Sequence, residues 1–362
     1  MPTKDLKETF FKLVRLGVGS QSADTTNIPE GLNWVLLQTI SEENGVSAIV
    51  LDGLDRLPSK SYSIPVPLKK QWIGQLYHIE NKNSIQWKSA VEMAQLFREK
   101  AIRTYVLKGQ VIAECYPKPN HRSSSDMDCY LLSLDGNPNA WESGNSMIES
   151  RGFEVKRNHY KNSTFYLPGL MVENHKFLTP FRGNRHLTAL EVMLQRMIYD
   201  DKGDDCFEGA FLFKPPVMVS SLFLIEHAYS HFLHEGLTWR HILDWMMFSK
   251  RHNNEIDWQS FSTYVDEFGF RLFYNSFVHL GGYLLGELQE DELSDLDKMM
   301  LADVWAPLDI HPDVHGWKSK LVLARNTWRA GWKYRHFSKL SMIHALWIQV
   351  KGFLFMRHPE LK

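Results

Sequence analysis

Residues 122–132 have the sequence Arg-Ser-Ser-Ser-Asp-Met-Asp-Cys-Tyr-Leu-Leu, in which two acidic residues open an apolar run. The apolar run is typical of a strand, and a strand places residues i and i+2 on the same face. Asp126 and Asp128 therefore leave one face side by side, where their charges repel unless a cation lies between them. Mg²⁺ and Mn²⁺ bind a few carboxylates together with water and phosphate oxygens. The pair predicts a metal site for phosphoryl or nucleotidyl transfer.

Short apolar segments surround this strand and predict a small mixed sheet. Their order along the chain is β-α-β-α-β-β-β, which is typical of an α+β or mixed-sheet unit. The predicted strands are 104–107, 126–132, 153–156, 163–167 and 170–177, and the predicted helices between them are 110–116 and 141–149.

The remaining sequence is mostly helical in period. Helices are expected before residue 100, apart from a proline-containing connector at 57–67, and again at 187–199, 217–233, 237–250 and 258–285. We therefore predict an α+β fold in which a small sheet core is flanked by N-terminal helices and a larger C-terminal helical region. The expected domains are 1–100, 101–182, 183–300 and 301–362.

Composition excludes several classes of protein. With 362 residues and 44% hydrophobic side chains, the chain can bury a sizeable core. A net charge of -1 gives no argument for a DNA partner. The three cysteines form no CxxC pair, so a disulfide framework or a zinc ribbon is not expected. Residues 1–5 lack the pattern of a signal peptide, and no apolar stretch reaches about 18 residues, so we expect no membrane span and a cytoplasmic location.

Two further motifs complete the expected site. Lys108-Gly109 ends a predicted strand, where glycine lets the backbone approach a phosphate and the following helix directs its N–H groups there. Glu173 shares a strand face with His175 and would give a third carboxylate on a neighbouring strand. We expect Glu173 to bind a second cation or to act as general base. Arg122 is expected to pair with a phosphate oxygen.

The order of these motifs resembles an uncharacterised bacterial nucleotidyltransferase family of the DNA polymerase β-like superfamily. The stretches that carry the resemblance are Leu107-Lys108-Gly109, Tyr116-Pro117, Arg122, Asp126-Met127-Asp128, Val172-Glu173-Asn174-His175, His227-Ala228 with His231, and Arg240 with Asp244. The resemblance covers about residues 30–290 and implies a nucleotidyltransferase fold with two or three metal-binding carboxylates. The chain departs from the superfamily where Lys108-Gly109 replaces Gly-Gly or Gly-Ser, with a longer gap to the acidic pair.

We assign the expected residues to three roles. The catalytic and metal-binding residues are Asp126, Asp128 and Glu173. The nucleotide-binding residues are Lys108, Gly109, Arg122 and Ser125. The residues of a substrate pocket are His175, His227, His231, Arg240 and Asp244. The resemblance supports the importance of the helical residues without giving them a role.

Histidines 227, 231 and 234 lie on one helical stripe, which leaves a zinc site open as an alternative. We favour hydrogen bonds within the helical region, with Asp244 as a partner, or a pocket facing the metals. The basic segment 317–362 contains four interleaved tryptophans. It could lie on an anionic membrane surface or stack on RNA bases. We favour packing of its tryptophans on the domain, with its lysines facing water.

The leading hypothesis is a metal-dependent nucleotidyltransferase that moves a nucleoside monophosphate from ATP or another NTP to a hydroxyl. The acceptor is a small molecule, a sugar or a protein side chain, and the sequence does not choose among them. Two alternatives remain open. One is a non-catalytic scaffold or regulatory protein on the same fold, and the other is a glycosyltransferase that uses the DxD motif to hold a nucleotide sugar.

Overall fold

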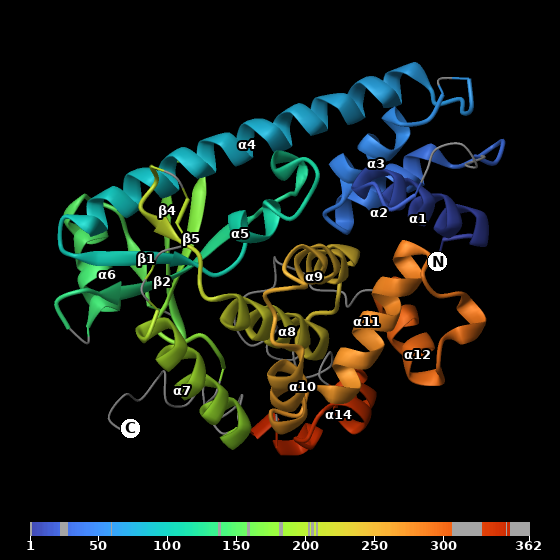
Figure 1. Ribbon diagram of the computed structural model, residues 1–362. Helices are drawn as coiled ribbons and strands as arrows, with labels where there is room; N and C mark the ends of the chain where they lie inside the picture. The colour runs from blue at the N-terminus through green and yellow to red at the C-terminus, as the bar shows by residue number, and fades with distance from the viewer. Residues whose placement is uncertain are drawn as a thin grey trace.

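A six-stranded mixed sheet lies toward one end of the molecule (Figure 1). The computed structural model describes residues 2–21, 28–58, 60–136, 139–157, 160–180, 184–201, 203, 206–207, 209–305, 328–344 and 346–347. The sheet has the order β3-β4-β5-β2-β1-β6. Its strands are β1 (Ile102–Val106), β2 (Asp126–Ser133), β3 (Val155–Lys156), β4 (Asn162–Leu167), β5 (Leu170–His175) and β6 (Leu212–Phe213). The predicted α+β class, with a small mixed sheet between helical regions, is confirmed.

Strand β2 occupies the middle of the sheet and fixes the register of its neighbours. It runs antiparallel to β1 and parallel to β5, with Asp128 paired to Glu173 across the parallel ladder. The two-residue strand β6 was not predicted. It pairs in parallel with residues Thr104 and Tyr105 of β1 and is too short to show a period of its own.

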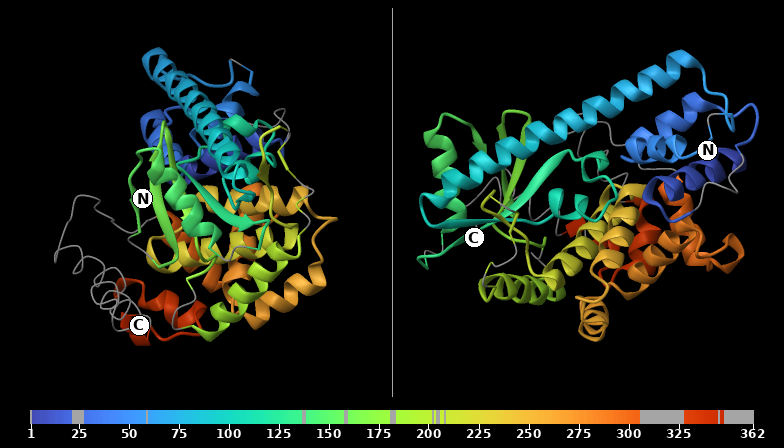
Figure 2. Two further views of the ribbon diagram at one scale, coloured as in Figure 1. Left: turned by 90° about the vertical axis from the view of Figure 1, so that its left-hand side faces the viewer. Right: turned by 45° about the horizontal axis from the view of Figure 1, so that its top comes forward.

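Helices enclose the sheet and extend far beyond it (Figure 1). They are α1 (Lys4–Val18), α2 (Trp34–Glu43), α3 (Ser47–Asp55), α4 (Val66–Arg98), α5 (Gln110–Ala113), η2 (Pro119–His121), α6 (Ala140–Ser150), α7 (Arg185–Tyr199), α8 (Val217–His234), α9 (Trp239–Arg251), α10 (Trp258–Glu267), α11 (Arg271–Leu285), η3 (Glu290–Glu292), α12 (Asp295–Trp305) and α14 (Gly331–Phe337). Figures 1 and 2 show α4 on one side of the sheet and helices α8 to α11 on the other.

Helix α4 joins the N-terminal helices to the sheet. Its 33 residues span about 50 Å at 1.5 Å per residue. Near its start, the indole Nε1 of Trp72 donates a hydrogen bond of 2.7 Å to Ser47 Oγ of α3. Near its end, Ala94 and Phe97 are buried against the sheet side of the core. Both ends are therefore anchored, and α4 serves as a brace between the two regions (Figure 1).

The N-terminal helices also hold the beginning of α9. Asn44, which caps the C-terminus of α2, accepts a hydrogen bond of 3.0 Å from the backbone N–H of Trp239. The ring of Trp239 packs edge-on against Phe11 of α1 at 4.9 Å between centroids. The first turn of α9, which carries two residues of the site described below, is thereby fixed from outside the sheet core.

Two predicted helices differ from the structure. The helix expected at 110–116 is a single turn, Gln110–Ala113, and the short helix η2 follows at Pro119–His121. The helix expected at 258–285 is divided into α10 and α11 at Gly269, whose φ of +84° interrupts the helical backbone. None of the described helices is long and apolar enough to cross a membrane.

Most of the basic C-terminal segment lies outside the described residues. Within the described part, the expectation that lysines face water is wrong for Lys333, which is completely buried and pairs with Asp303 at 2.6 Å. Trp332 packs edge-on against Phe232 of α8, as expected. Trp328 is instead 72% exposed. The membrane and RNA alternatives for this segment stay untested.

Candidate nucleotidyl-transfer site

Two carboxylates, Asp128 and Glu173, meet where β2 and β5 lie side by side, and a third, Asp126, begins β2 on the same face. Asp126 and Asp128 leave the same face of β2, and Glu173 stands opposite Asp128 in β5. Ligand atoms of Asp128, Glu173 and His175 all lie within 4.8 Å of one another. Asp128 is only 2% exposed, whereas Asp126 is half-buried at the start of the strand. The adjacent-strand position expected for Glu173 is the one that the structure shows.

Asp128 is held by a lysine and a histidine. Lys108 Nζ lies 2.9 Å from Oδ2, and His175 Nε2 lies 3.0 Å from Oδ1. Burial opposes the charge of Asp128, but Lys108 and the hydrogen bond from His175 outweigh burial and hold the pKa of the carboxyl well below its usual value. Asp128 is therefore a fixed carboxylate, and its Oδ2 accepts no well-directed hydrogen bond from the described residues.

Glu173 experiences the opposite balance. Its Oε2 accepts a hydrogen bond of 2.8 Å from Asn162 Nδ2 of β4. Burial, followed by repulsion from Asp128, raises the pKa of the Glu173 carboxyl. Asp128 and Glu173 repel each other, and a buried oxygen of Asp128 accepts no well-directed hydrogen bond from the described residues. Closely spaced carboxylates of this kind form a donor set that suits a hard divalent cation. The residues present therefore fit the metal that the sequence predicts.

His175 lies beneath the carboxylates. The residue is 2% exposed and does not line the cavity described below, and the substrate-pocket role expected for it stays a prediction. Its Nδ1 faces the carbonyl oxygen of Phe177 at 3.2 Å while Nε2 faces Asp128. Because the ionised Asp128 carboxylate can only accept, Nε2 is the donor in this contact and the ring orients Asp128.

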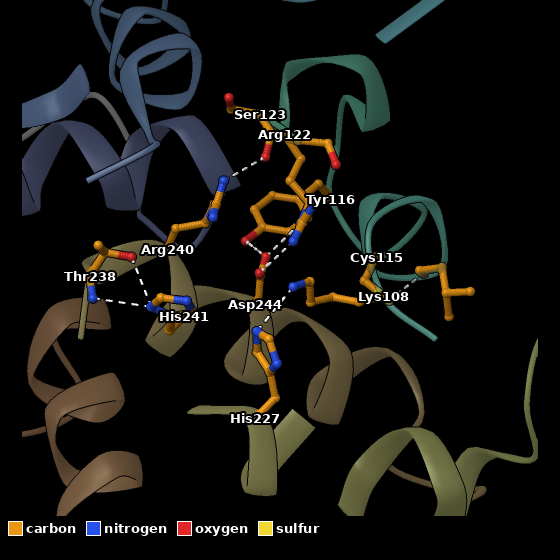
Figure 3. A network of polar contacts seen from close by, with 12 residues as sticks. Lys108, Cys115, Tyr116, Arg122, Ser123, His227, Thr238, Arg240, His241 and Asp244 are labelled. Carbon is orange, nitrogen blue, oxygen red and sulfur yellow. Dashed lines mark hydrogen bonds and ion pairs between the residues drawn. The ribbon is translucent and has the colours of Figure 1, made fainter. Parts of the chain in front are cut away.

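The Lys108-Gly109 turn directs the lysine at the carboxylates. Gly109 has φ of +70°, a left-handed backbone conformation that favours glycine. A side chain at this position would point toward Ser124 Oγ and the carbonyl oxygen of Asp126. Lys108 Nζ also lies 3.0 Å from His227 Nε2 of α8 (Figure 3). The turn thus supplies a side-chain ammonium group, while α5 has only four residues and is a short source of the helix N–H groups that the sequence suggested.

Arg122 and Asp244 form an ion pair with each other. The Arg122 guanidinium donates two hydrogen bonds to the Asp244 carboxylate, at 2.7 and 2.6 Å, and Tyr116 Oη donates a third at 2.7 Å (Figure 3). Both charged side chains are buried. In this structure Arg122 and Asp244 contact each other rather than the cavity or the histidines. The phosphate contact expected for Arg122 and the substrate-pocket role expected for Asp244 stay predictions. The pair ties the η2 segment to α9.

A cavity of about 290 Å³ opens beside Asp126. Its wall contains Lys108, Ser125, Asp126, His227, His231, Glu235, Gly236, Leu237, Thr238, Arg240 and His241. Ser125 donates a hydrogen bond of 2.9 Å to Asp126 Oδ1. The sheet core and the helical region thus share one cavity, which brings several of the sequence-predicted residues together.

The histidine cluster in this wall differs from the expected stripe. His234 turns away, with Nδ1 at 2.8 Å from the Ser230 carbonyl and Nε2 at 3.3 Å from Tyr334 Oη. Its place is taken by His241 of α9, whose ring lies 4.8 Å from that of His231. Sequence reasoning missed His241. Its position three residues after Thr238, at the start of a helix, was the available signal.

The comparisons with known proteins address the family. The model of the uncharacterised nucleotidyltransferase family matches residues 30–286, which is more than half of the chain. The chain belongs to this family. The comparisons with curated proteins and with solved structures gave no match. The family match includes the three carboxylates, the Lys108 turn and the cavity-lining part of α9, and it leaves α1 and α12 outside.

Proposed function

We propose that this member of the family is a metal-dependent nucleotidyltransferase that moves a nucleoside monophosphate from an NTP to a hydroxyl. The observation that carries the proposal is the pairing of Asp128 with Glu173 across β2 and β5, with Asp126 on the same face of β2 in the wall of a cavity that Lys108 also lines. In the proposed reaction, the acceptor oxygen bonds to the α-phosphorus and the bond to the β-phosphate oxygen breaks. Pyrophosphate leaves with that electron pair, and the acceptor proton passes to a base, for which we propose Glu173.

The three carboxylates would hold Mg²⁺ or Mn²⁺. When bound, such a cation neutralises phosphate charge and lowers the pKa of a hydroxyl. The surrounding side chains support this arrangement. His175 orients Asp128, and Asn162 orients Glu173 through the hydrogen bonds described above. Positioning and charge neutralisation of this kind are what phosphoryl transfer chiefly requires.

The first test is calorimetric binding of ATP, GTP, CTP and UTP with and without Mg²⁺. Asp126→Asn is the sharper variant, because Asp126 forms no ion pair within the described residues, whereas Asp128 neutralises buried Lys108. We expect wild-type protein to bind at least one NTP only with Mg²⁺, and Asp126→Asn to lose this binding. Asp55→Asn, an exposed carboxylate on α3, is the matched control and should bind as the wild type does.

The second test is pyrophosphate release from the bound NTP in the presence of hydroxyl acceptors of three classes: small molecules, sugars and protein side chains. Mg²⁺-dependent release that disappears in Asp126→Asn supports transfer. Folded protein that binds no NTP contradicts the proposal. Binding of a nucleoside diphosphate sugar instead would favour the glycosyltransferase alternative, and binding of neither would favour the scaffold alternative.

A further inference from the structure

The cavity beside the carboxylates contains an arginine that lacks an acidic partner. Arg240 projects from the first turn of α9, and Nη1 donates one hydrogen bond of 3.0 Å to the Ser123 carbonyl (Figure 3). Its Nε is buried and has no hydrogen-bond partner, and no carboxylate among the described residues forms an ion pair with it. A largely buried guanidinium without a carboxylate is costly unless an anion completes it.

His241 presents a hydrogen-bond donor to the same cavity. The backbone N–H of Thr238 donates to His241 Nδ1 at 3.1 Å, in the reciprocal cap that begins α9. Burial, and next the neighbouring His231, hold the pKa of His241 well below its usual value, so the ring is neutral. In a neutral ring whose Nδ1 is an acceptor, the proton resides on Nε2. The free ring nitrogen is therefore an N–H donor.

The same geometry disfavours a metal at the histidine cluster. His227, His231 and His241 have ligand atoms within 4.8 Å of one another, which would suit a transition metal by distance alone. A metal-bound histidine must offer an unprotonated nitrogen. His241 Nε2 carries its proton, and His227 Nε2 already faces the Lys108 ammonium at 3.0 Å. In this arrangement neither Nε2 atom offers a free lone pair to a metal.

We propose that this cavity holds the β- and γ-phosphates of the nucleotide, with Lys108, Arg240 and His241 as the groups that contact them. This inference rests on the proposed function and names the part of the site that receives the leaving pyrophosphate. About 290 Å³ is at the small end for a ligand pocket, which suits a polyphosphate better than a whole nucleotide. The helical region would thus supply the contacts for which the superfamily uses a Gly-Gly or Gly-Ser loop.

The test is calorimetric titration of the full chain with inorganic pyrophosphate at low ionic strength in EDTA. We expect saturable binding by wild-type protein and at least about tenfold weaker binding by Arg240→Gln. Arg251→Gln, on the exposed last turn of the same helix, is the matched control and should bind as the wild type does. Equal affinity in Arg240→Gln and Arg251→Gln, or no saturable binding by wild-type protein, would overturn the inference.

A second variant separates an anion site from a metal site. His241→Glu keeps the reciprocal cap, because Thr-x-x-Glu is a favourable start for a helix, but it places a negative charge in the cavity. We expect it to lose pyrophosphate binding while its unfolding midpoint stays within a few degrees of the wild type. Visible tetrahedral Co²⁺ bands in wild-type protein, retained in His241→Glu because glutamate can bind a metal, would overturn the anion assignment.

Failure of this inference can be distinguished from failure of the proposed function. Asp126→Asn should lose Mg²⁺-dependent NTP binding but keep pyrophosphate binding in EDTA, since it removes a negative charge from the cavity wall. Mg²⁺-dependent NTP binding that Arg240→Gln leaves unchanged would overturn the phosphate site and leave nucleotidyl transfer standing. Pyrophosphate binding that depends on Arg240, without any NTP binding, would overturn the nucleotide assignment of both.

Discussion

Removing the Arg122–Asp244 ion pair would test whether these two motif residues stabilise the fold or bind a ligand. Asp244→Ala would leave the Arg122 guanidinium and the Tyr116 hydroxyl buried without their carboxylate partner. The side chains of the ion pair are only 2% and 5% exposed, so water cannot replace the lost contacts without rearrangement. Removing one partner of a buried pair costs about 3–5 kcal/mol of unfolding free energy. That is a large share of the roughly 5–15 kcal/mol available to a protein.

Two control variants make the measurement specific. Tyr116→Phe removes one hydrogen bond and leaves the ion pair intact, so its cost should be about 1–3 kcal/mol. The double variant Arg122→Met/Asp244→Met removes both charges and should recover much of the loss, because neither charge is left unpaired. Unfolding in urea, followed by tryptophan fluorescence and circular dichroism, measures all three without screening the charges by salt.

Two results would refute this reasoning. A cost below about 1 kcal/mol for Asp244→Ala would show that the pair contributes little to the fold. A double variant no more stable than Asp244→Ala would show that the unpaired charge is not the cause. If stability is unchanged and NTP binding is lost, Arg122 and Asp244 bind ligand directly, as the sequence first suggested.

Three further predictions concern other buried groups. Burial raises the pKa of Glu226 to about 7 from 4.5. As pH rises from 4.5 to 7, the unfolding free energy of the wild type should therefore fall by about 3 kcal/mol relative to that of Glu226→Gln. A stability difference in urea that stays constant with pH contradicts this. The hydrogen bond to Asp52 raises the pKa of His121 above 6.5. The unfolding free energy that wild type has in excess of His121→Gln should therefore be largest below pH 6.5 and decline at higher pH. An equal excess at about pH 6 and about pH 9 argues against this prediction. Gly109→Ala should lower the unfolding free energy by about 1–3 kcal/mol because of the φ of +70°, and unchanged urea stability would show that the turn is not strained.

Local sequence pattern predicted the parts of the site that depend on a single strand. The alternation of side chains places Asp126 and Asp128 on one face of β2 and Glu173 with His175 on one face of β5, as the structure shows. The N-terminal and C-terminal helical regions were also predictable, because their apolar residues recur with the period of a helix. Failures were local as well: Gly269 breaks a helix that the apolar pattern alone would continue.

The sequence by itself determined the acidic strand, its facing and the helical surroundings, since these follow from the short-range geometry of the backbone. Only the tertiary structure decided which distant side chains meet. Parallel pairing of β2 with β5 places Glu173 opposite Asp128. Packing of α9 brings Asp244 into contact with Arg122, which lies 122 positions earlier in the sequence. The same packing places His241 in the cavity wall, whereas His234 lies outside it and contacts Tyr334. Such contacts depend on the packing of whole elements, and the periodicity of one element carries no information about its partner.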